Sequence, residues 1–521
     1  MIFLRNKEFW LLIAITAFVM FFNLGGIPLL DPDEPVYAET PLEMIASHDF
    51  LSPRIYGEFW YDKPPMYYWL VAAAFQGFGV SEFSARFPSA LLAVVCVAFV
   101  YFSGSRLFGR LAGLTGALVL ATSVEYFYLG KAAVTDITLT FCLTAALLSF
   151  LREKYYLFYV FCGLAVLTKG PVGCLFPGAI IFLYMLVTRQ FGILKKMKLP
   201  VGVILFSMIA LPWYIVMYNI HGSIFLDTFI GFHNVTRFTS PEHPEVVLWY
   251  YFIPVLLLGF FPWTAVLVQS VWRSLTAARQ DERNSLLFLN IWAVFIFVFF
   301  SISQTKLVSY ILPMYPPLAM VAGWYISRIY EENRTRRPLA WPVLLTIFAI
   351  LWAGGLYFGA KKLPELANGV WVEIGVLTIM ACFVWYFYRK KSFQRAFAVQ
   401  IAGMVLFIMV LVGMLFPAVA PRFTARDIAR DFVINYDRQS PVYVVKFLRP
   451  GFAFYSGFYG KATTSEQELM ARIDEPGKAY FVVRRLEYNY LLKTRPDLFA
   501  KQSGPVSIVA DQPETLLLLK Q

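Results

Sequence analysis

The sequence predicts an all-α polytopic membrane protein with about thirteen transmembrane helices, followed by a small C-terminal α/β domain. Three observations lead to this fold class. Of the 521 residues, 59% are hydrophobic and only 15% are charged, and the mean hydropathy is +0.61. Soluble domains carry roughly 45–50% apolar and about 25% charged residues. The composition therefore excludes a cytosolic enzyme, a disordered chain and a secreted disulfide scaffold.

Each span needs about 20 predominantly apolar residues. The first apolar run is not followed by a small-residue cleavage site, so we expect an uncleaved first helix. An odd number of spans leaves the tail on the side opposite the N-terminus. The expected spans are residues 9–29, 84–103, 110–129, 133–151, 155–169, 171–188, 200–218, 247–271, 285–303, 308–328, 339–358, 370–388 and 397–417.

The basic residues orient these spans. In a soluble protein the net charge of +12 would suggest a nucleic-acid partner. In a membrane protein the placement of Lys and Arg matters more, because they are retained in cytoplasmic loops. With a cytoplasmic N-terminus, the cytoplasmic loops hold more than twice as many basic residues as the outer loops. We therefore expect a cytoplasmic N-terminus, an outer C-terminal tail and no nucleic-acid partner.

Two apolar segments of the outer side are expected to lie on the membrane surface. Residues 66–80 are too short for a comfortable span and follow Pro64 and Pro65. If they crossed, every later basic loop would change sides, so we expect an interfacial or re-entrant helix. Residues 36–48 are expected to form a second surface helix, with Pro41 in its first turn, where a missing N–H costs nothing.

The tail alternates polar helical stretches with strand-like runs. This order predicts an α/β domain over 421–521, behind a transmembrane domain over 1–420. The expected helices lie at 424–436 and 465–473, and the expected strands at 441–448, 478–486 and 506–510.

The cysteines all lie in apolar runs and show neither CxxC nor Cys/His spacing. We expect them to pack in the core, and we expect neither a disulfide framework nor a metal site. They are Cys96, Cys142, Cys162, Cys174 and Cys382.

Ionisable residues gather on the outer side at the ends of the expected spans. Ionisable groups at membrane depth are costly and usually mark a pathway, an ion pair or a site. A single one is explained as a snorkelling side chain or a solvated loop charge, but eight on one face favour a shared cavity. They are Asp33, Glu34, Lys63, Asp136, Lys169, His233, Arg237 and Lys306.

This set suggests phosphate chemistry. Lys63, Arg237, Lys306 and the hydroxyl of Tyr310 would hold a phosphate through charge-assisted hydrogen bonds. Asp33 would then orient or deprotonate an acceptor. A cavity open to both lipid and water suits a substrate with an apolar tail and a phosphorylated head.

Five segments resemble motifs of the GT-C membrane glycosyltransferases, most of all the bacterial lipid A aminoarabinose transferases, with the protein O-mannosyltransferases as more distant relatives. The resemblance extends over about residues 8–420. The segments are DPDEPVYAE, YDKPPMYYW, LTKGP, GFFPWT and KLVSYILPMYPPLA.

The resemblance implies roles for individual residues. The catalytic acid falls on Asp33, followed by Glu34, and a second outer-face acid falls on Asp136. Lys63 of the Lys-Pro-Pro motif is expected at the donor phosphate. The other implied substrate-binding residues are Tyr37, Lys169, His233, Arg237, Lys306 and Tyr310.

The resemblance also implies an activity. Family members take a sugar from an undecaprenyl-phosphate carrier and transfer it with inversion on the periplasmic face of the bacterial inner membrane. The implied partners are the polyprenyl-phosphate sugar donor, membrane lipids, and lipid A or another envelope acceptor. No firm cofactor is implied, and a dependence on divalent metal stays open.

Two other readings stay open at this level. One is a transporter or flippase of the same lipids, although transporters usually show related halves with broken helices, and no internal repeat is visible here. The other is an enzyme of the protein O-mannosyltransferase type, which shares the leading acidic motif.

Overall fold

A computed structural model describes residues 7–236, 239, 248–331, 339–500 and 505–521. The chain divides into two compact units, and each is described by itself. The first consists of Met1–Phe22, Tyr61–Tyr67 and Phe87–Val412, and the second of Asn23–Trp60, Tyr68–Arg86 and Gly413–Gln521.

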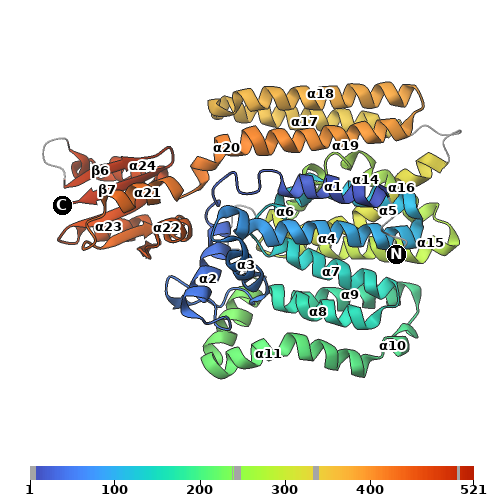
Figure 1. The fold of residues 1–521 in the computed structure, drawn as a ribbon, viewed down its shortest axis with the longest axis horizontal. Helices are drawn as coiled ribbons and strands as arrows, with labels where there is room; N and C mark the ends of the chain where they lie inside the picture. The colour runs from blue at the N-terminus through green and yellow to red at the C-terminus, as the bar shows by residue number, and fades with distance from the viewer. Residues whose placement is uncertain (1–6, 237–238, 240–247, 332–338, 501–504) are drawn as a thin grey trace. The chain divides into compact units, whose positions relative to one another are not determined.

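The first unit is a helical bundle built from long apolar segments. Helices α17, α18 and α19 lie side by side in it (Figure 1). Its elements are α1 (Lys7–Phe21), most of α4 (Glu82–Phe108), α5 (Arg110–Ala121), α6 (Val124–Gly130), α7 (Asp136–Leu151), α8 (Tyr155–Lys169), α9 (Val172–Thr188), α10 (Ile193–Lys196), α11 (Leu199–Leu226), η2 (Asp227–Thr236), α13 (Phe252–Gly259), α14 (Thr264–Thr276), α15 (Gln280–Ile302), η4 (Val308–Met314), α16 (Tyr315–Glu331), α17 (Ala340–Lys362), η5 (Pro364–Leu366), α18 (Ala367–Arg389) and α19 (Phe393–Val410).

The core of this bundle is the contact between α5 and α16, which small residues make possible. A Cβ on Gly323 would lie 2.3 Å from the backbone nitrogen of Gly116. The hydroxyl of Thr115 donates to the carbonyl of Gly323 at 2.9 Å. Small residues let helix backbones approach closely where no hydrophobic effect drives helices together in lipid.

Two of the expected spans are broken helices. The α5–α6 pair bends by 66° and the α13–α14 pair by 106°. Polar groups at the two breaks hydrogen-bond to each other. Val124 N donates to the carbonyl of Phe261 at 3.3 Å, and the Trp263 indole donates to Thr122 Oγ1 at 2.9 Å. Irregular backbone at membrane depth is tolerated where protein groups replace the lost helical bonds.

Fewer helices than expected meet the length and hydropathy of a span. Among the described residues six do so, or up to eight if each bent pair is one span. Helices α7, α8 and α9 are apolar but only 15 to 17 residues long. The structure thus supports a multi-pass helical membrane protein, while the thirteen crossings remain a prediction.

The second unit begins with the loop that carries the acidic motif. It contains α2 (Asp33–Ser47), the short antiparallel pair β1 (Arg54–Ile55) and β2 (Glu58–Phe59), and most of α3 (Met66–Phe78). Both expected helices are therefore present, while their position on the membrane surface remains a prediction. The placement of Pro41 was wrong, since α2 starts at Asp33 and Pro41 lies inside it, where the proline ring removes a helical hydrogen bond.

The C-terminal part of the second unit contains the expected α/β domain. Its five-stranded sheet has the order β4-β3-β5-β7-β6, with β3 parallel to β4 and β5, and β7 antiparallel to β5 and β6. The elements are α20 (Phe416–Val419), η7 (Ala420–Phe423), α21 (Arg426–Asn435), β3 (Val442–Val445), α22 (Arg449–Ser456), β4 (Lys461–Thr463), α23 (Glu466–Asp474), β5 (Ala479–Arg484), α24 (Arg485–Thr494), η8 (Pro496–Phe499), β6 (Val506–Asp511) and β7 (Thr515–Lys520), preceded by η6 (Leu411–Leu415) where the two units join.

The cysteines are all free, as expected. Core packing holds for Cys96, Cys142 and Cys162, but Cys174 and Cys382 are exposed on their helices. An apolar run does not distinguish the inward face of a membrane helix from its lipid face, which explains this error.

Candidate functional site

The first group of predicted site residues in the helical unit surrounds the Lys-Pro-Pro motif. Lys63 Nζ lies 2.8 Å from Asp62 Oδ1, and His233 Nδ1 lies 2.7 Å from the same oxygen. The three side chains are only 8–13% exposed. Lys63 directly precedes Pro64, which biases the backbone of Lys63 away from the helical region. His233 is carried by η2, a wide helical turn of a kind that is frequent at functional sites.

A second group joins the ends of three helical elements. Lys169 is the last residue of α8, and Asp136 is the first residue of α7. The distance from Lys169 Nζ to Asp136 Oδ1 is 2.7 Å. The ammonium also lies 5.1 Å from the centre of the Tyr310 ring. An electrostatic interaction between Lys169 and Asp62 links this group to the first one. The helical unit therefore brings together five of the predicted residues at one end, and adds Asp62.

Lys306 has a different environment from the other predicted cations. Its Nζ donates to the carbonyl oxygens of Phe300, Ser301 and Ser303 at 3.4, 2.8 and 2.8 Å. These are carbonyls at the end of α15, which have no helical donor. Desolvation lowers the pKa of the Lys306 ammonium below its ordinary value. An ammonium has three N–H donors, so binding a phosphate would require Lys306 to release a helix end.

The acidic motif lies in the second unit, where its two acids have different environments. Asp33 is exposed and is the first residue of α2. A negative charge at this end of a helix interacts favourably with the positive end of the helix dipole. Glu34 is buried and bound by Arg86 through Nε at 2.8 Å and Nη2 at 2.6 Å. The same carboxylate accepts from Leu30 N at 2.9 Å.

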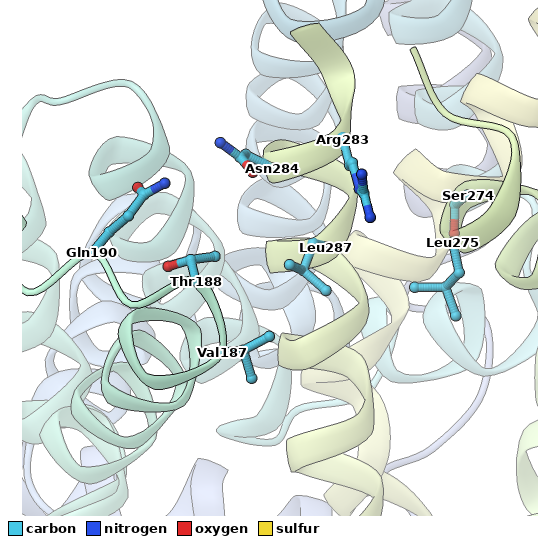
Figure 2. A pocket seen from close by; sticks show the side chains of 8 residues that line it. All are labelled: Val187, Thr188, Gln190, Ser274, Leu275, Arg283, Asn284 and Leu287. Carbon is cyan, nitrogen blue, oxygen red and sulfur yellow. The ribbon is translucent and has the colours of Figure 1, made fainter. Parts of the chain in front are cut away.

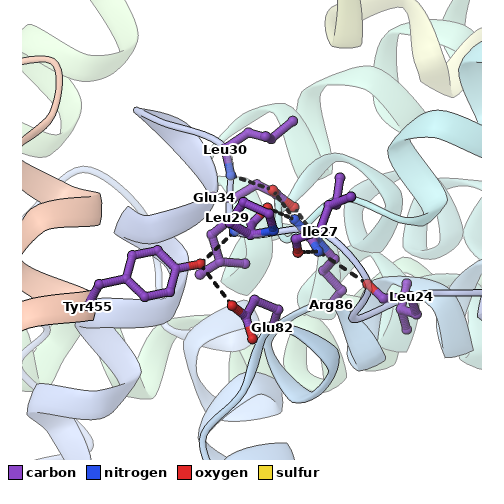
Figure 3. A network of polar contacts seen from close by, with 9 residues as sticks. Leu24, Ile27, Leu29, Leu30, Glu34, Glu82, Arg86 and Tyr455 are labelled. Atoms are coloured by element: carbon purple, nitrogen blue, oxygen red, sulfur yellow. Dashed lines mark hydrogen bonds and ion pairs between the residues drawn. The ribbon is translucent and has the colours of Figure 1, made fainter. Parts of the chain in front are cut away.

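Arg86 organises the chain that leads into the motif. Its remaining donors go to the carbonyls of Leu24, Ile27 and Pro28 at 3.2, 2.8 and 2.7 Å (Figure 3). A guanidinium that is 3% exposed is thus surrounded by acceptors. Glu34 is thus a buried member of an ion pair, whereas Asp33, next to it in the motif, is exposed.

The other predicted residues are placed as follows. Tyr37 packs against Tyr68, with ring centres 5.9 Å apart in the second unit. Arg237 lies outside the described residues. Asp33, Glu34 and Tyr37 thus belong to one unit and the other described site residues to the other, and each group is described within its own unit.

Further along α2, Glu39 is an unusual acid. It is 2% exposed, and its Oε2 has no hydrogen-bond partner among the described residues. Burial, together with the charge of Glu43, raises the pKa of Glu39 to about 8. Glu39 is therefore largely protonated at neutral pH.

Sequence reasoning missed Asp62 and Arg86. Asp62 directly precedes Lys63, and a carboxylate beside a predicted phosphate-binding lysine was the available signal. Arg86 is 52 positions from Glu34 and carries no local signal of that pairing.

The described residues contain no group of three His, Cys, Asp or Glu side chains that could hold a metal ion. The Asp62 carboxylate and the His233 imidazole are in contact, with 2.7 Å between Oδ1 and Nδ1. A separate cavity of about 390 Å³ lies where α9 and α14 end and α15 begins, and none of the predicted site residues lines it (Figure 2).

The chain resembles known proteins in both sequence and fold. Residues 62–215 match the family described as dolichyl-phosphate-mannose-protein mannosyltransferase. An undecaprenyl phosphate-alpha-4-amino-4-deoxy-L-arabinose arabinosyl transferase of Edwardsiella ictaluri is 28% identical over 77% of this chain and 76% of that protein. An uncharacterized protein of Aquifex aeolicus is 30% identical, and the match spans 62% of this chain and 64% of that protein.

The fold has a close counterpart among solved structures. The crystal structure of ArnT from Cupriavidus metallidurans bound to undecaprenyl phosphate matches with a TM-score of 0.82 at 24% identity, over 99% of this chain and 98% of that one. At this identity the match establishes the shared fold.

Proposed function

Because the chain belongs to the GT-C membrane glycosyltransferases of the lipid A aminoarabinose transferase type, we propose that it transfers a sugar from a polyprenyl-phosphate carrier to an envelope acceptor. The proposed acceptor is lipid A or a related lipopolysaccharide component. The proposed reaction inverts the anomeric carbon and takes place on the periplasmic face.

The observation that carries this proposal is the linked set of buried ion pairs in the helical unit. Lys63 and Lys169 are each paired with an aspartate, so both ammonium groups can stay charged away from bulk water. When the bond between sugar and carrier breaks, negative charge develops on the departing lipid phosphate. A fixed cation in a site of low dielectric stabilises the added charge of the departing phosphate monoester more than it stabilises the single charge of the phosphodiester donor.

Asp33 is the proposed acid at the acceptor. With a lipid A phosphate as acceptor, the attacking oxygen is already anionic and Asp33 would orient it through a bound proton or cation. With a hydroxyl acceptor, Asp33 would remove the proton as a general base. In both cases the acceptor oxygen forms the new bond to the anomeric carbon while the lipid phosphate leaves with the bonding electrons.

The test uses purified protein in detergent or vesicles with a radiolabelled polyprenyl-phosphate sugar. Label that appears covalently on lipid A supports the proposal, and Asp33→Asn should abolish it without changing thermal stability. Movement of intact donor across vesicles without covalent transfer would instead support a transporter. Adding and removing a chelator in the same assay measures divalent-cation dependence.

A protein acceptor is the second candidate, and the match to a protein mannosyltransferase family over 62–215 favours it. Peptide acceptors offered in the same assay distinguish the two. Transfer to peptide and not to lipid A would overturn the proposed acceptor while preserving the donor chemistry.

We also propose thirteen crossings, a cytoplasmic N-terminus and a periplasmic C-terminal domain. Cysteines introduced at the exposed positions Gly192 and Gln467 test this, after the exposed Cys174 and Cys382 are replaced by Ser. In intact cells an impermeant thiol reagent should label position 467 and not position 192. The reverse labelling would overturn the orientation.

A further inference from the structure

The second unit contains a buried carboxylate that the proposed reaction does not use. Asp31 lies two residues before Asp33 and is 7% exposed. Its Oδ2 accepts from Ala425 N at 2.8 Å and its Oδ1 from Gly451 N at 2.9 Å. Its own backbone N–H donates to the carbonyl of Phe423 at 2.8 Å. One residue of the outer loop is thus bound at three points to the C-terminal part of the chain.

The two donors explain why a side chain with two acceptor oxygens suits this position. Ala425 directly precedes α21, and Gly451 lies in the first turn of α22. The first N–H groups of a helix have no partner within the helix, and the positive end of the helix dipole favours an anion there. Gly451 also permits the approach, because a Cβ at this position would lie 2.3 Å from Asp31 Oδ2.

Further contacts from α22 hold the segments on either side of α2. The hydroxyl of Tyr455 accepts from Leu29 N at 2.7 Å and lies 3.2 Å from Glu82 Oε1 (Figure 3). The guanidinium of Arg449 lies 3.9 Å from the centre of the Tyr56 ring. The start of α2 and the loop that follows it are therefore both attached to the same short helix of the C-terminal domain.

We propose that Asp31 is a positioning residue, through which the C-terminal α/β domain holds the first turn of α2 and so aims Asp33 for the transfer reaction. This inference rests on the role proposed for Asp33. Both oxygens of Asp31 are bound by backbone N–H groups, so Asp31 itself does not act on substrate. The C-terminal domain is accordingly part of the catalytic scaffold.

Asp31→Asn and Gly451→Ala test the contact from its two sides. The amide NH₂ of Asn would face an N–H donor, and the alanine Cβ would displace the carboxylate. Each variant should lower kcat about tenfold or more while the KM for the polyprenyl-phosphate sugar changes less than twofold. Because both changes break one contact, the double variant should lose little more than either single variant. Asp437→Asn is the matched control, since Asp437 pairs with Lys478 on the same domain, and its kcat should equal that of wild type.

Hydrogen exchange gives a readout that does not depend on activity. Amides of residues 29–36 should exchange faster in Asp31→Asn than in wild type or Asp437→Asn, at a temperature where all three are folded. Unchanged exchange would overturn the contact itself, whether or not the protein transfers sugar. Faster exchange with a wild-type kcat, in a wild type that does transfer sugar, would overturn the positioning role. A wild type without transfer would refute the proposed function and leave exchange to decide on the contact.

Discussion

The two acids of the Asp33-Glu34 motif should respond in opposite ways to loss of their charge. Glu34→Gln removes the anion that Arg86 binds through two donors at 2.8 and 2.6 Å, and leaves the guanidinium with carbonyl partners alone. The side chains are 7% and 3% exposed, so water does not replace the lost partner. Breaking a buried pair from one side costs about 3–5 kcal/mol. Folded proteins are stable by only about 5–15 kcal/mol, so this is a large fraction of the total.

Thermal unfolding of the purified variants in detergent measures this effect. Glu34→Gln should melt well below wild type, and the molecules that remain folded should still transfer sugar. Asp33→Asn should melt with wild type and transfer no sugar. Glu58→Gln is the matched control in the same loop, because Glu58 is exposed and its loss should change stability by less than about 0.5 kcal/mol. A Glu34→Gln protein that is as stable as wild type but inactive would refute this reasoning and move the catalytic role to Glu34.

Three further predictions concern buried charges. Lys63→Ala should raise the KM for the lipid-linked donor about tenfold or more, with partial rescue by Arg. Initial rates over a donor series, measured on the folded fraction, test this, and an unchanged KM would remove Lys63 from the site. Lys169→Met should destabilise the fold by about 3–5 kcal/mol, because it leaves the Asp136 carboxylate without its cation. Adding Asp136→Asn should restore part of this loss, and thermal melts that show no recovery in the double variant would contradict the prediction. Folding raises the pKa of Glu39 from 4.5 to about 8, so the folded state binds this proton more tightly than the unfolded state does. The free energy of unfolding should therefore fall by about 1.4 kcal/mol for each unit that the pH rises between these two values, and it should stay level above pH 8. Melts of Glu39→Gln across this range should lack that slope, and an equal slope in both proteins would exclude Glu39 as its cause.

Several properties of this chain follow from the sequence alone, because they depend on local composition. The apolar run at 155–169 is bounded by charged residues, and α8 has those same ends. The alternation of polar helices and apolar strands after residue 421 likewise produces the predicted α/β domain, since each short run carries its own periodicity. The grouping of Lys63, Asp136, Lys169, His233 and Tyr310 could also be predicted, because the predicted directions of the spans bring certain loop ends to one side of a membrane.

The tertiary structure alone decided how deeply each of these charges is buried. Hydropathy reports how much of a segment is apolar and not where it bends, so the 66° and 106° breaks were not predictable. Asp31, Asp33 and Glu34 are similar acids within four positions, yet one binds backbone N–H groups about 400 residues away, one stays exposed, and one pairs with Arg86. The free energy of a buried charge depends on the donors that the fold places around it, and those donors come from distant parts of the chain. Local sequence specifies the acids, and packing specifies which of them are buried and which groups surround them.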